Sequence, residues 1–198
     1  MYIPKHFEEH NRDRIIDLAR DYAFATLVTV KDGAPLANHY PLLIEDSDNL
    51  TILGHMAKSN EQWKHFDGKH ESLVIFQGPH TYISPSNYEG PGVPTWNYSV
   101  VHMIGKGRVI DDKKTLINII ESLTEKYEAS QEPPWTLQYP DSMLDAIVGF
   151  ELVVERIEAK YKLSQNRSET ERKIIINNLG KSTNDNARRI AKMMSDIR

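Results

Sequence analysis

Short runs of alternating apolar and polar residues, separated by turn-forming residues, fill much of the first 110 positions of the sequence. Phe24 to Val30 is one such run, and the Asp32-Gly33 pair that follows it favours a tight hairpin. Pro35 to Ile44 is predicted as the return strand and Leu50 to Leu53 as the third strand of a meander. Further strands are predicted at 72–76, with a turn at 77–80, and at 81–84, 99–110 and 148–161. Such a series favours an antiparallel barrel.

Helical spacing of apolar residues is confined to fewer segments. Residues 8–22 and Asp111 to Tyr127 each carry one apolar stripe, and the second is capped by Asp111 or Asp112. Asp141 to Ala146 is expected to form a short helix within the linker that follows Pro133-Pro134. Ser168 and Glu171 have capping-box spacing, which predicts a helix to Leu179 before a basic helix over 184–194. The expected domains are residues 1–167, a barrel, and residues 168–198, a helical extension packed on the barrel or on a dimer partner.

Composition excludes several classes of protein. The chain of 198 residues is long enough for one domain with a core, and its 39% hydrophobic and 26% charged residues are ordinary for a globular protein. The absence of cysteine excludes a disulfide framework, a thiolate metal site and a cysteine nucleophile. No apolar run approaches the roughly 20 residues that span a bilayer, and the first residues lack the apolar core of a signal peptide. A cytoplasmic location without membrane contact is expected.

Charge is distributed unevenly along the chain. The net charge of −4 argues against a general nucleic-acid-binding protein. Residues 156–198, however, carry 11 Lys and Arg against 5 Asp and Glu. This basic segment is a candidate for contact with DNA, although a solvated helical face or a subunit contact explains the same imbalance.

Several catalytic motifs are missing. The sequence has no G-x-S-x-G and no Walker A loop, and Gly105-Lys-Gly107 lacks the third glycine of a dinucleotide fingerprint. The eight histidines show no metal-ligand spacing, so no metal site is predicted, and no pair of carboxylates suggests acid–base catalysis. Catalytic residues stay unknown and enzymatic activity stays open. Any redox or group-transfer chemistry would come from a bound organic cofactor.

The stretch from Leu50 to Trp63 is the first candidate binding site. Its strand is expected to break at Gly54 into a polar turn, and the capping-box spacing of Ser59-Asn-Glu-Gln62 predicts a fresh helix. Unpaired N–H groups and the helix dipole would favour an anion there. Lys58 adds a positive charge and His55 a donor, which predicts a phosphate site. An ordinary capped turn with a solvated lysine is the alternative explanation.

A second candidate lies after a loop rich in proline, glycine and serine, residues 84–94. A loop of this length is often functional. Trp96, Asn97 and Tyr98 follow it and would present an aromatic wall and an amide to a planar ligand. Trp96 as a core or interface anchor is the competing explanation.

Seven segments of the sequence form one pattern: Met1-Tyr-Ile-Pro4, Asn38-His-Tyr-Pro41, Gly54-His-Met-Ala-Lys-Ser-Asn60 with Gln62-Trp63, Val74-Ile-Phe-Gln-Gly-Pro-His80, Tyr82-Ile-Ser84, Val93-Pro-Thr-Trp-Asn-Tyr98 and Lys162-Leu-Ser-Gln-Asn-Arg167. Taken together, they make the whole chain resemble the PaiB family, the FMN-binding negative transcriptional regulators of the FMN-binding split-barrel superfamily. Tyr40 departs from the leucine expected in this family.

The resemblance implies a mainly β fold with α, a six-stranded antiparallel Greek-key split barrel with flanking helices, and a homodimer with FMN at its interface. It implies a phosphate turn made by Gly54, His55, Met56, Ala57, Lys58, Ser59, Asn60 and Trp63. Asn38 and His39 would lie beside the isoalloxazine ring. A further group would approach the flavin from the other subunit, namely Trp96, Asn97, Tyr98, Lys162, Gln165 and Asn166.

The leading hypothesis is therefore an FMN-binding split-barrel protein with a role in transcriptional regulation or redox chemistry. A flavin-dependent oxidoreductase related to pyridoxamine-phosphate oxidase is one alternative. A regulator that contacts DNA through its basic C-terminal helices, and a haem-binding protein on the same scaffold, are the others.

Overall fold

The computed structural model describes residues 1–88, 92–135 and 140–197. Within this part of the chain it has seven β-strands and five α-helices, and its contacts divide it into two compact units. The barrel unit comprises Ile16–Phe76 and His102–Ile157, and the terminal unit comprises Met1–Ile15, Gln77–Val101 and Glu158–Arg198. Parts of the expected loop 84–94 and linker 135–146 lie outside the described residues. None of the helices that the structure describes is long and apolar enough to cross a bilayer.

Four short strands open the barrel unit. They are β1 (Phe24–Lys31), β2 (Ala34–Pro41), β3 (Leu43–Asp46) and β4 (Leu50–Ala57). The predicted hairpin is confirmed, because β1 and β2 pair antiparallel around Asp32 and Gly33, both of which have positive φ. The predicted single return strand and three-strand meander are wrong, because that strand divides at Leu42 into β2 and β3.

The break at Leu42 closes the barrel. The sheet order is β2-β1-β5-β6-β7-β4-β3, so the two edge strands are consecutive in the chain. Leu42 between them is fully buried, and its N–H donates to the carbonyl of Ala23 at 3.0 Å. β2 pairs with β1 and β3 pairs with β4, so one bent strand joins both edges. The expected six strands and the observed seven are therefore the same barrel, counted with β2 and β3 as one or as two.

Three long strands run through both units. They are β5 (Asp67–Ile83), β6 (Thr95–Ile110) and β7 (Ile147–Lys162). The predicted turn at 77–80 is wrong, because β5 is continuous there and joins the two runs expected at 72–76 and 81–84. β6 begins four residues before the expected Ser99 and β7 matches its predicted range closely. Apolar periodicity thus predicted where these strands lie, but β5 and β6 are longer than predicted.

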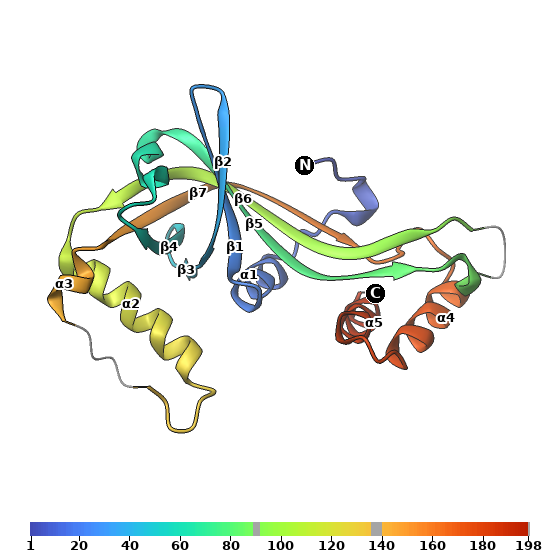
Figure 1. Ribbon diagram of the computed structural model, residues 1–198. Helices are drawn as coiled ribbons and strands as arrows, with labels where there is room; N and C mark the ends of the chain where they lie inside the picture. Colours follow the sequence, from blue (N-terminus) through green and yellow to red (C-terminus); the bar gives the residue numbers. More distant parts are fainter. Residues whose placement is uncertain (89–91, 136–139, 198) are drawn as a thin grey trace. The chain divides into compact units, whose positions relative to one another are not determined.

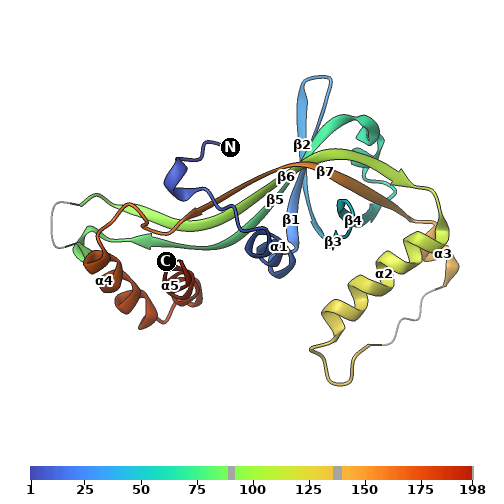
Figure 2. The same ribbon diagram turned by 180° about the vertical axis from the view of Figure 1, so that it is seen from behind.

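Helices cover part of the barrel unit. α1 (Arg12–Asp21) is shorter at its start than predicted, since a 3₁₀ turn, η1 (Lys5–Phe7), precedes it. α2 (Lys113–Glu128) is confirmed, with the Asp112 carboxylate accepting from the N–H of Thr115 as its N-cap. Ile119 and Leu123 of α2 pack against Leu53 of β4. The short α3 (Asp141–Leu144) follows, and Figures 1 and 2 both show it beside the start of α2.

The helix predicted after Ser59 is not an α-helix. A 3₁₀ helix, η2 (Glu61–His65), stands there, and Asn60 rather than Ser59 caps it by accepting from the N–H of Gln62. β4 also continues to Ala57 instead of breaking at Gly54. A Cβ at Gly54 would lie 2.7 Å from side-chain carbons of Leu42 and Phe150, so this glycine serves close packing inside the barrel.

The terminal unit is built around its two C-terminal helices, α4 (Glu169–Gly180) and α5 (Asp185–Asp196), which lie side by side (Figures 1 and 2). The capping box of Ser168 and Glu171 is present as predicted, and Asn184 caps α5. The 3₁₀ turn η3 (Pro85–Asn87) precedes β6. The expected boundary between residues 167 and 168 stays a prediction, because α4 and α5 share this unit with parts of β5, β6 and β7.

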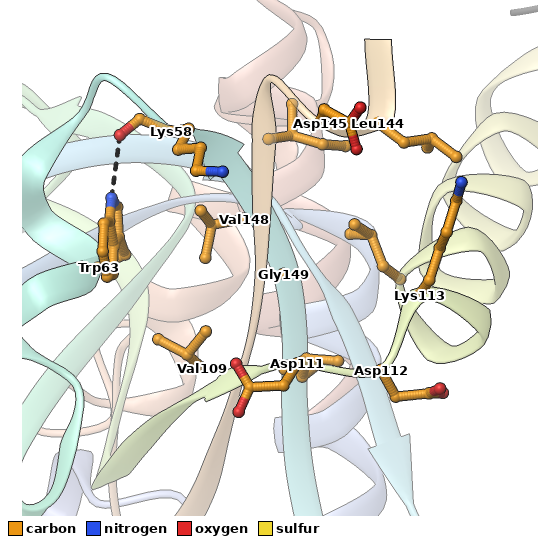
Figure 3. Close-up of a pocket in the computed structure, with 13 residues that line it drawn as sticks. Lys58, Trp63, Val109, Asp111, Asp112, Lys113, Leu144, Asp145, Val148 and Gly149 are labelled. Carbon is orange, nitrogen blue, oxygen red and sulfur yellow. Dashed lines mark hydrogen bonds between the residues drawn. The ribbon is translucent and has the colours of Figure 1, made fainter. Parts of the chain in front are cut away.

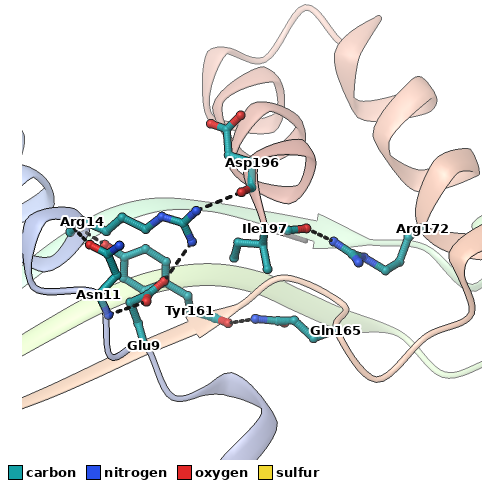
Figure 4. Close-up of polar contacts among 8 residues, drawn as sticks. All are labelled: Glu9, Asn11, Arg14, Tyr161, Gln165, Arg172, Asp196 and Ile197. Carbon is teal, nitrogen blue, oxygen red and sulfur yellow. Dashed lines mark hydrogen bonds and ion pairs between the residues drawn. The ribbon is translucent and has the colours of Figure 1, made fainter.

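Two arginines hold the end of α5. Nη2 of Arg14 donates to the carbonyl of Asp196 at 2.9 Å, and Nη2 of Arg172 donates to the carbonyls of Met194 and Ile197 at 2.9 and 3.0 Å (Figure 4). Guanidinium groups at a helix C-terminus satisfy carbonyls that have no partner within the helix. α5 is thereby fastened both to α4 and to the start of α1.

Candidate functional site

The connection between β4 and η2 presents a cation to solvent. Lys58 and Ser59 are both exposed there. Among the residues that the structure describes, no carboxylate forms an ion pair with Lys58, whereas the next lysine, Lys64, pairs with Glu61. An exposed ammonium beside an exposed serine is chemistry that suits a phosphate ester.

Backbone donors contribute less to this turn than the sequence suggested. The N–H of Lys58 donates to the carbonyl of Ala146 at 2.8 Å, and the N–H of Asn60 donates to Ala57 at 2.9 Å. The N–H of Gln62 is taken by the Asn60 side chain at 3.1 Å. The expected N-terminus of an α-helix is therefore absent, and three of the N–H groups that were to bind an anion, those of Lys58, Asn60 and Gln62, are already bonded. Anion recognition here has to come mainly from side chains.

A buried amide fixes this turn to the barrel. The Gln62 side chain is fully buried, and its Nε2 donates to the carbonyls of Leu27 and Leu36 at 3.1 and 3.2 Å and lies 3.2 Å from Oγ1 of Thr29. Its Oε1 accepts from the Tyr40 hydroxyl at 2.8 Å and from the Asn38 amide at 3.0 Å. The network is satisfied at every position, which makes it rigid.

Asn60 and Trp63 complete that support. Nδ2 of Asn60 donates to the Tyr40 hydroxyl at 2.7 Å, and Nε1 of Trp63 donates to the carbonyl of Lys58 at 3.0 Å. Burial raises the pKa of Tyr40, and the hydrogen bond from Asn60 opposes that rise. Tyr40, noted as a departure from the family pattern, thus joins β2 to η2. Gln62 belongs to a segment of the family resemblance but is not among the predicted site residues. The spacing of residues in the sequence does not reveal that a buried amide has hydrogen-bond partners.

Residues of β4 alternate between the barrel interior and its outside. Gly54 and Met56 are buried, and Sδ of Met56 lies 3.8 Å from the Tyr40 hydroxyl oxygen. His55 points to the other side and is half-buried, and burial lowers its pKa. Nδ1 of His55 is buried without a hydrogen-bond partner among the described residues. A buried polar atom of this kind, three residues before Lys58, calls for a partner such as an ordered water or a ligand atom.

A cavity of about 330 Å³ adjoins Lys58 and Trp63. Figure 3 shows Lys58 and Lys113 entering from opposite sides, with Asp145 and Asp111 at its edges. The rest of its lining is mostly apolar: Val109, Ile110, Leu116, Leu144, Ile147 and Val148. This volume falls in the range of small-molecule sites, roughly 300–1,000 Å³.

Asn38 and His39 lie on opposite faces of β2. Asn38 turns inward to Gln62, whereas His39 is exposed and stacks on Phe24 of β1 with ring centroids 6.2 Å apart. A ligand seated on one face of β2 would therefore contact only one of these side chains directly. His39 is the one that faces solvent, and Asn38 supports the turn from behind.

The second predicted group lies in the terminal unit, and its members differ in accessibility. Asn97 is 1% exposed, and its amide exchanges hydrogen bonds with the Ser164 hydroxyl at 3.0 and 3.2 Å. Gln165 accepts from the N–H of Leu163 and donates to the carbonyl of Tyr161, which holds the turn after β7 in place (Figure 4). Both amides therefore have clear structural roles.

The other members of this group are open to contact. Trp96 is 52% exposed, Asn166 is exposed, and Tyr98 and Lys162 are half-buried. Nζ of Lys162 donates to the Trp96 carbonyl at 2.9 Å and to Oγ1 of Thr95. The structure thus brings the first predicted group together in the barrel unit and the second together in the terminal unit.

Comparison with known proteins points to one family. The model described as "Putative FMN-binding domain" matches residues 1–156. "Protease synthase and sporulation protein PAI 2" of Bacillus subtilis is 43% identical over 202 residues, which cover 99% of this chain and 97% of that protein.

Two solved structures share the fold. The match to the FAD and heme binding protein of Mycobacterium smegmatis has a TM-score of 0.61 at 16% sequence identity, and it covers 78% of this chain and 73% of the chain of that protein. The match to the flavocytochrome Anf3 of Azotobacter vinelandii has a TM-score of 0.62 at 9% sequence identity, and it covers 81% of this chain and 72% of the chain of that protein. At these identities the likeness concerns the fold alone. The expected fold class, a mainly β split barrel with helices, is confirmed.

Proposed function

The chain belongs to the PaiB family of FMN-binding proteins, and from this premise we propose that it is a homodimeric flavoprotein with a regulatory role, in which the turn between β4 and η2 holds the phosphate of FMN. The observation that carries the proposal is the exposed Lys58, which has no carboxylate partner among the described residues, on a turn that the buried Gln62 fixes in place. Ser59 lies beside Lys58 on the turn, and His55, near the end of β4, has an Nδ1 without a hydrogen-bond partner in the described part of the chain.

Each residue of the turn has a distinct task in this proposal. Lys58 supplies the charge that pairs with the phosphate dianion, and Ser59 orients it by donating a hydrogen bond. Gln62, Asn60 and Trp63 keep the turn from moving when the ligand is absent, which lowers the entropy that binding has to remove. FMN itself would supply electron-transfer chemistry when bound. A contact between FMN and the second predicted group stays a prediction from the family resemblance.

Replacing Lys58 tests the phosphate assignment. We expect Lys58→Met to weaken the Kd for FMN about tenfold or more, the usual loss for a charge-assisted hydrogen bond to phosphate. Titration of flavin fluorescence measures the effect, and Lys69→Met, at another exposed lysine of the barrel unit, is the matched control. Equal FMN affinity in Lys58→Met and in the unaltered protein would remove the phosphate from this turn.

An apolar face of the barrel unit supports the homodimer. On the outside of β2, β1 and β5, registered neighbours are nearly all apolar: Pro35, Ala37, Val30, Val28, Phe24, Leu73 and Ile75. Phe24 is 69% exposed and Val30 is 53% exposed. A largely apolar sheet face of this kind, interrupted by Thr26 and His39, favours contact with a second copy. His39 lies on the same face, which fits a flavin bound near the dimer contact.

The regulatory role rests on the relative's name and on the basic C-terminal helices. Arg188, Arg189 and Lys192 are exposed on α5, although Asp185 pairs with both arginines. Removing residues 168–198 would expose the strand residues that α4 and α5 cover, among them Asn97, which contacts Met194 of α5, so point variants are the better test. Changing all three cations to Gln should abolish salt-sensitive retention of DNA, and unchanged retention would exclude this face as the contact. We also propose a cytoplasmic location, in keeping with a chain that has no cysteine.

A flavin-dependent oxidoreductase is the second candidate, favoured by the cavity of about 330 Å³ beside Lys58. Bleaching of the bound flavin by NAD(P)H and its recovery on adding an oxidant would support an enzyme. The haem alternative is separated by one absorption spectrum of the purified protein, since haem gives a Soret band and flavin does not.

A further inference from the structure

The strands of the terminal unit present two unlike faces. On β6, Asn97, Ser99 and Val101 are buried, and Asn97 contacts Met194 of α5. On β7, Ala159 and Tyr161 are buried, as is Leu163 directly after the strand, and the Tyr161 hydroxyl donates to the carbonyl of Arg14 at 2.9 Å (Figure 4). This face is the core side of the unit. Because side chains alternate along a strand, the residues between these point to the opposite face.

That opposite face gathers aromatic rings and two lysines. We call it the lysine–aromatic face and define it by His80 and Tyr82 of β5, Trp96 and Tyr98 of β6, and Lys160 and Lys162 of β7. The ring of Trp96 lies 6.1 Å from each of the rings of His80 and Tyr82, measured between centroids. Nζ of Lys160 lies 5.4 Å from the Tyr98 centroid. These contacts show that the residues from β5, β6 and β7 lie on one surface.

Lys160 is almost buried and has no carboxylate partner in the part of the chain that the structure describes. It is 8% exposed, and its Nζ donates to the carbonyl of Tyr2 at 3.1 Å and lies over the Tyr2 ring at 5.6 Å. Two carboxylates are its neighbours in the structure: Glu158, two residues earlier on β7, pairs with the amino group of Met1, and Glu8, whose backbone bridges to Lys160, lies 3.5 Å from Nε2 of His10. Among the described residues, the contacts of the Lys160 ammonium are therefore aromatic faces and one carbonyl.

Lys162 adds a second cation on the same strand face. Its two acceptors are Oγ1 of Thr95 and the carbonyl of Trp96, and among the described residues no carboxylate pairs with it. Burial lowers the pKa of Lys162, and the positive charge of Lys160 lowers it further. An ammonium has three N–H donors, so Lys162 retains one for a ligand. Two desolvated cations of like charge are costly unless an anion lies between or beside them.

The rings beside these cations remain open to a ligand. Trp96 is 52% exposed and Tyr82 is 46% exposed, and Tyr2, which touches Lys160, is 82% exposed. Exposed rings on a sheet surface bind flat aromatic molecules by stacking. Cations next to such rings add selectivity for a negative substituent on the stacked molecule.

We propose that the lysine–aromatic face binds a small planar aromatic anion other than FMN, with its ring against Trp96 and its carboxylate or other acidic group at Lys162 and Lys160. Charge complementarity selects this occupant, because a neutral ring would leave both ammonium groups uncompensated and a purely aliphatic anion would leave Trp96 and Tyr82 without a partner. Trp96, Tyr98 and Lys162 belong to the group that the family resemblance placed near FMN, so the flavin itself is the competing occupant. The proposal needs only the terminal unit and does not depend on the phosphate turn.

Calorimetric titration of the FMN-loaded protein tests the proposal with three probes. These are 2-naphthoate, its uncharged analogue 2-naphthamide, and cyclohexanecarboxylate, which has the charge without the aromatic ring. We expect saturable binding of 2-naphthoate and about tenfold or greater weakening for each of the other two, since each lacks one of the two contacts. The flavin absorption spectrum, recorded at each step, should show that FMN stays bound.

Variants locate the bound probe. Lys162→Met and Trp96→Leu should each weaken 2-naphthoate binding about tenfold, whereas Lys192→Met, at an exposed lysine of α5, should leave it unchanged. Thermal unfolding of each variant verifies that it is folded. The proposal is overturned by lack of saturable binding, by equal affinity for 2-naphthamide, by an unaffected Lys162→Met variant, or by release of FMN as the probe binds. Failure to load FMN at all would instead count against the proposed function, and the titration would still report on this face.

Discussion

The hydroxyl of Tyr40 donates a hydrogen bond of 2.8 Å to Oε1 of Gln62, which joins the second strand of the barrel to the turn that carries Lys58. The same hydroxyl accepts from Asn60 at 2.7 Å. Two polar residues on that turn therefore depend on one phenol for their position. Rigidity of the turn is set inside the barrel, several residues away from the exposed side chains that would meet a ligand.

Gln62→Leu should destabilise the protein by about 3 kcal/mol, because it removes the amide and leaves the buried groups of Leu27, Leu36 and Tyr40 without their partner. Urea unfolding measures this loss. FMN affinity should fall as well, although Gln62 is fully buried, because the turn loses its support.

Tyr40→Phe is the matched control for that prediction. It removes one hydroxyl and keeps the ring, so we expect a smaller loss of about 1 kcal/mol. The double variant should lose less than the sum of the two, since both changes break the same hydrogen bond. Additive losses would show that the two side chains act independently.

Gly105 and Gly107 illustrate a sequence pattern whose meaning only the structure reveals. They do not complete a dinucleotide fingerprint, and the structure shows instead why glycine is needed at both positions. A Cβ at Gly105 would lie 1.9 Å from the carbonyl oxygen of Val153, and one at Gly107 would lie 2.4 Å from the Phe66 ring. Both glycines allow close approach within the barrel unit.

Gly105→Ala should therefore destabilise the protein by more than about 2 kcal/mol, because backbone on β7 would have to move. Gly180→Ala is the control. A Cβ there meets nothing within 4 Å at the end of α4, so alanine should be neutral or stabilising by up to about 1 kcal/mol. Thermal unfolding of both variants distinguishes them, and similar losses would refute the packing explanation.

Regular periodicity and local capping were sufficient to predict much of this fold. α2, α4 and α5 lie close to where their stripes and caps indicated, and the Asp32-Gly33 hairpin is confirmed. The misassigned segments depend on distant contacts. Continuous β5 through Gly78-Pro79 and β4 through Gly54 are stabilised by neighbouring strands and by Phe150, which local sequence does not show. For the same reason, sequence indicated Lys58 as a site residue but not the network behind it.

The apolar outer face of β2, β1 and β5 predicts a dimer that one charge disrupts. Val28 lies at its centre, registered with Ala37 on one side and Leu73 on the other. Val28→Glu should convert the dimer to a folded monomer, since a buried, unpaired carboxylate at an interface is costly. Light scattering coupled to gel filtration measures the mass. Met143→Glu, at a residue of α3 that is 62% exposed, should leave the mass unchanged, and a monomeric unaltered protein would contradict the proposal.

The half-buried His55 predicts how stability depends on pH. Burial lowers its pKa below the ordinary value of 6.5, so the folded protein binds this proton less readily than the unfolded chain does. As pH falls through the ordinary value, the unfolded state gains protons first, and the free energy of unfolding should decrease. Unfolding in urea at about pH 7.5 and about pH 5.5 should show a steeper decrease for the unaltered protein than for His55→Gln. Parallel decreases would show that His55 is not responsible.

Added FMN extends this test to the proposed site. A phosphate dianion near His55 would favour the protonated ring and so oppose the effect of burial. Saturating FMN should therefore reduce the difference between the unaltered protein and His55→Gln at the lower pH, in addition to stabilising both by mass action. The comparison distinguishes a His55 ring that interacts with the phosphate from a ring that is only buried. Its Nδ1 has no hydrogen-bond partner among the described residues. A difference that persists unchanged in saturating FMN would place His55 out of reach of the phosphate while leaving Lys58 as its partner.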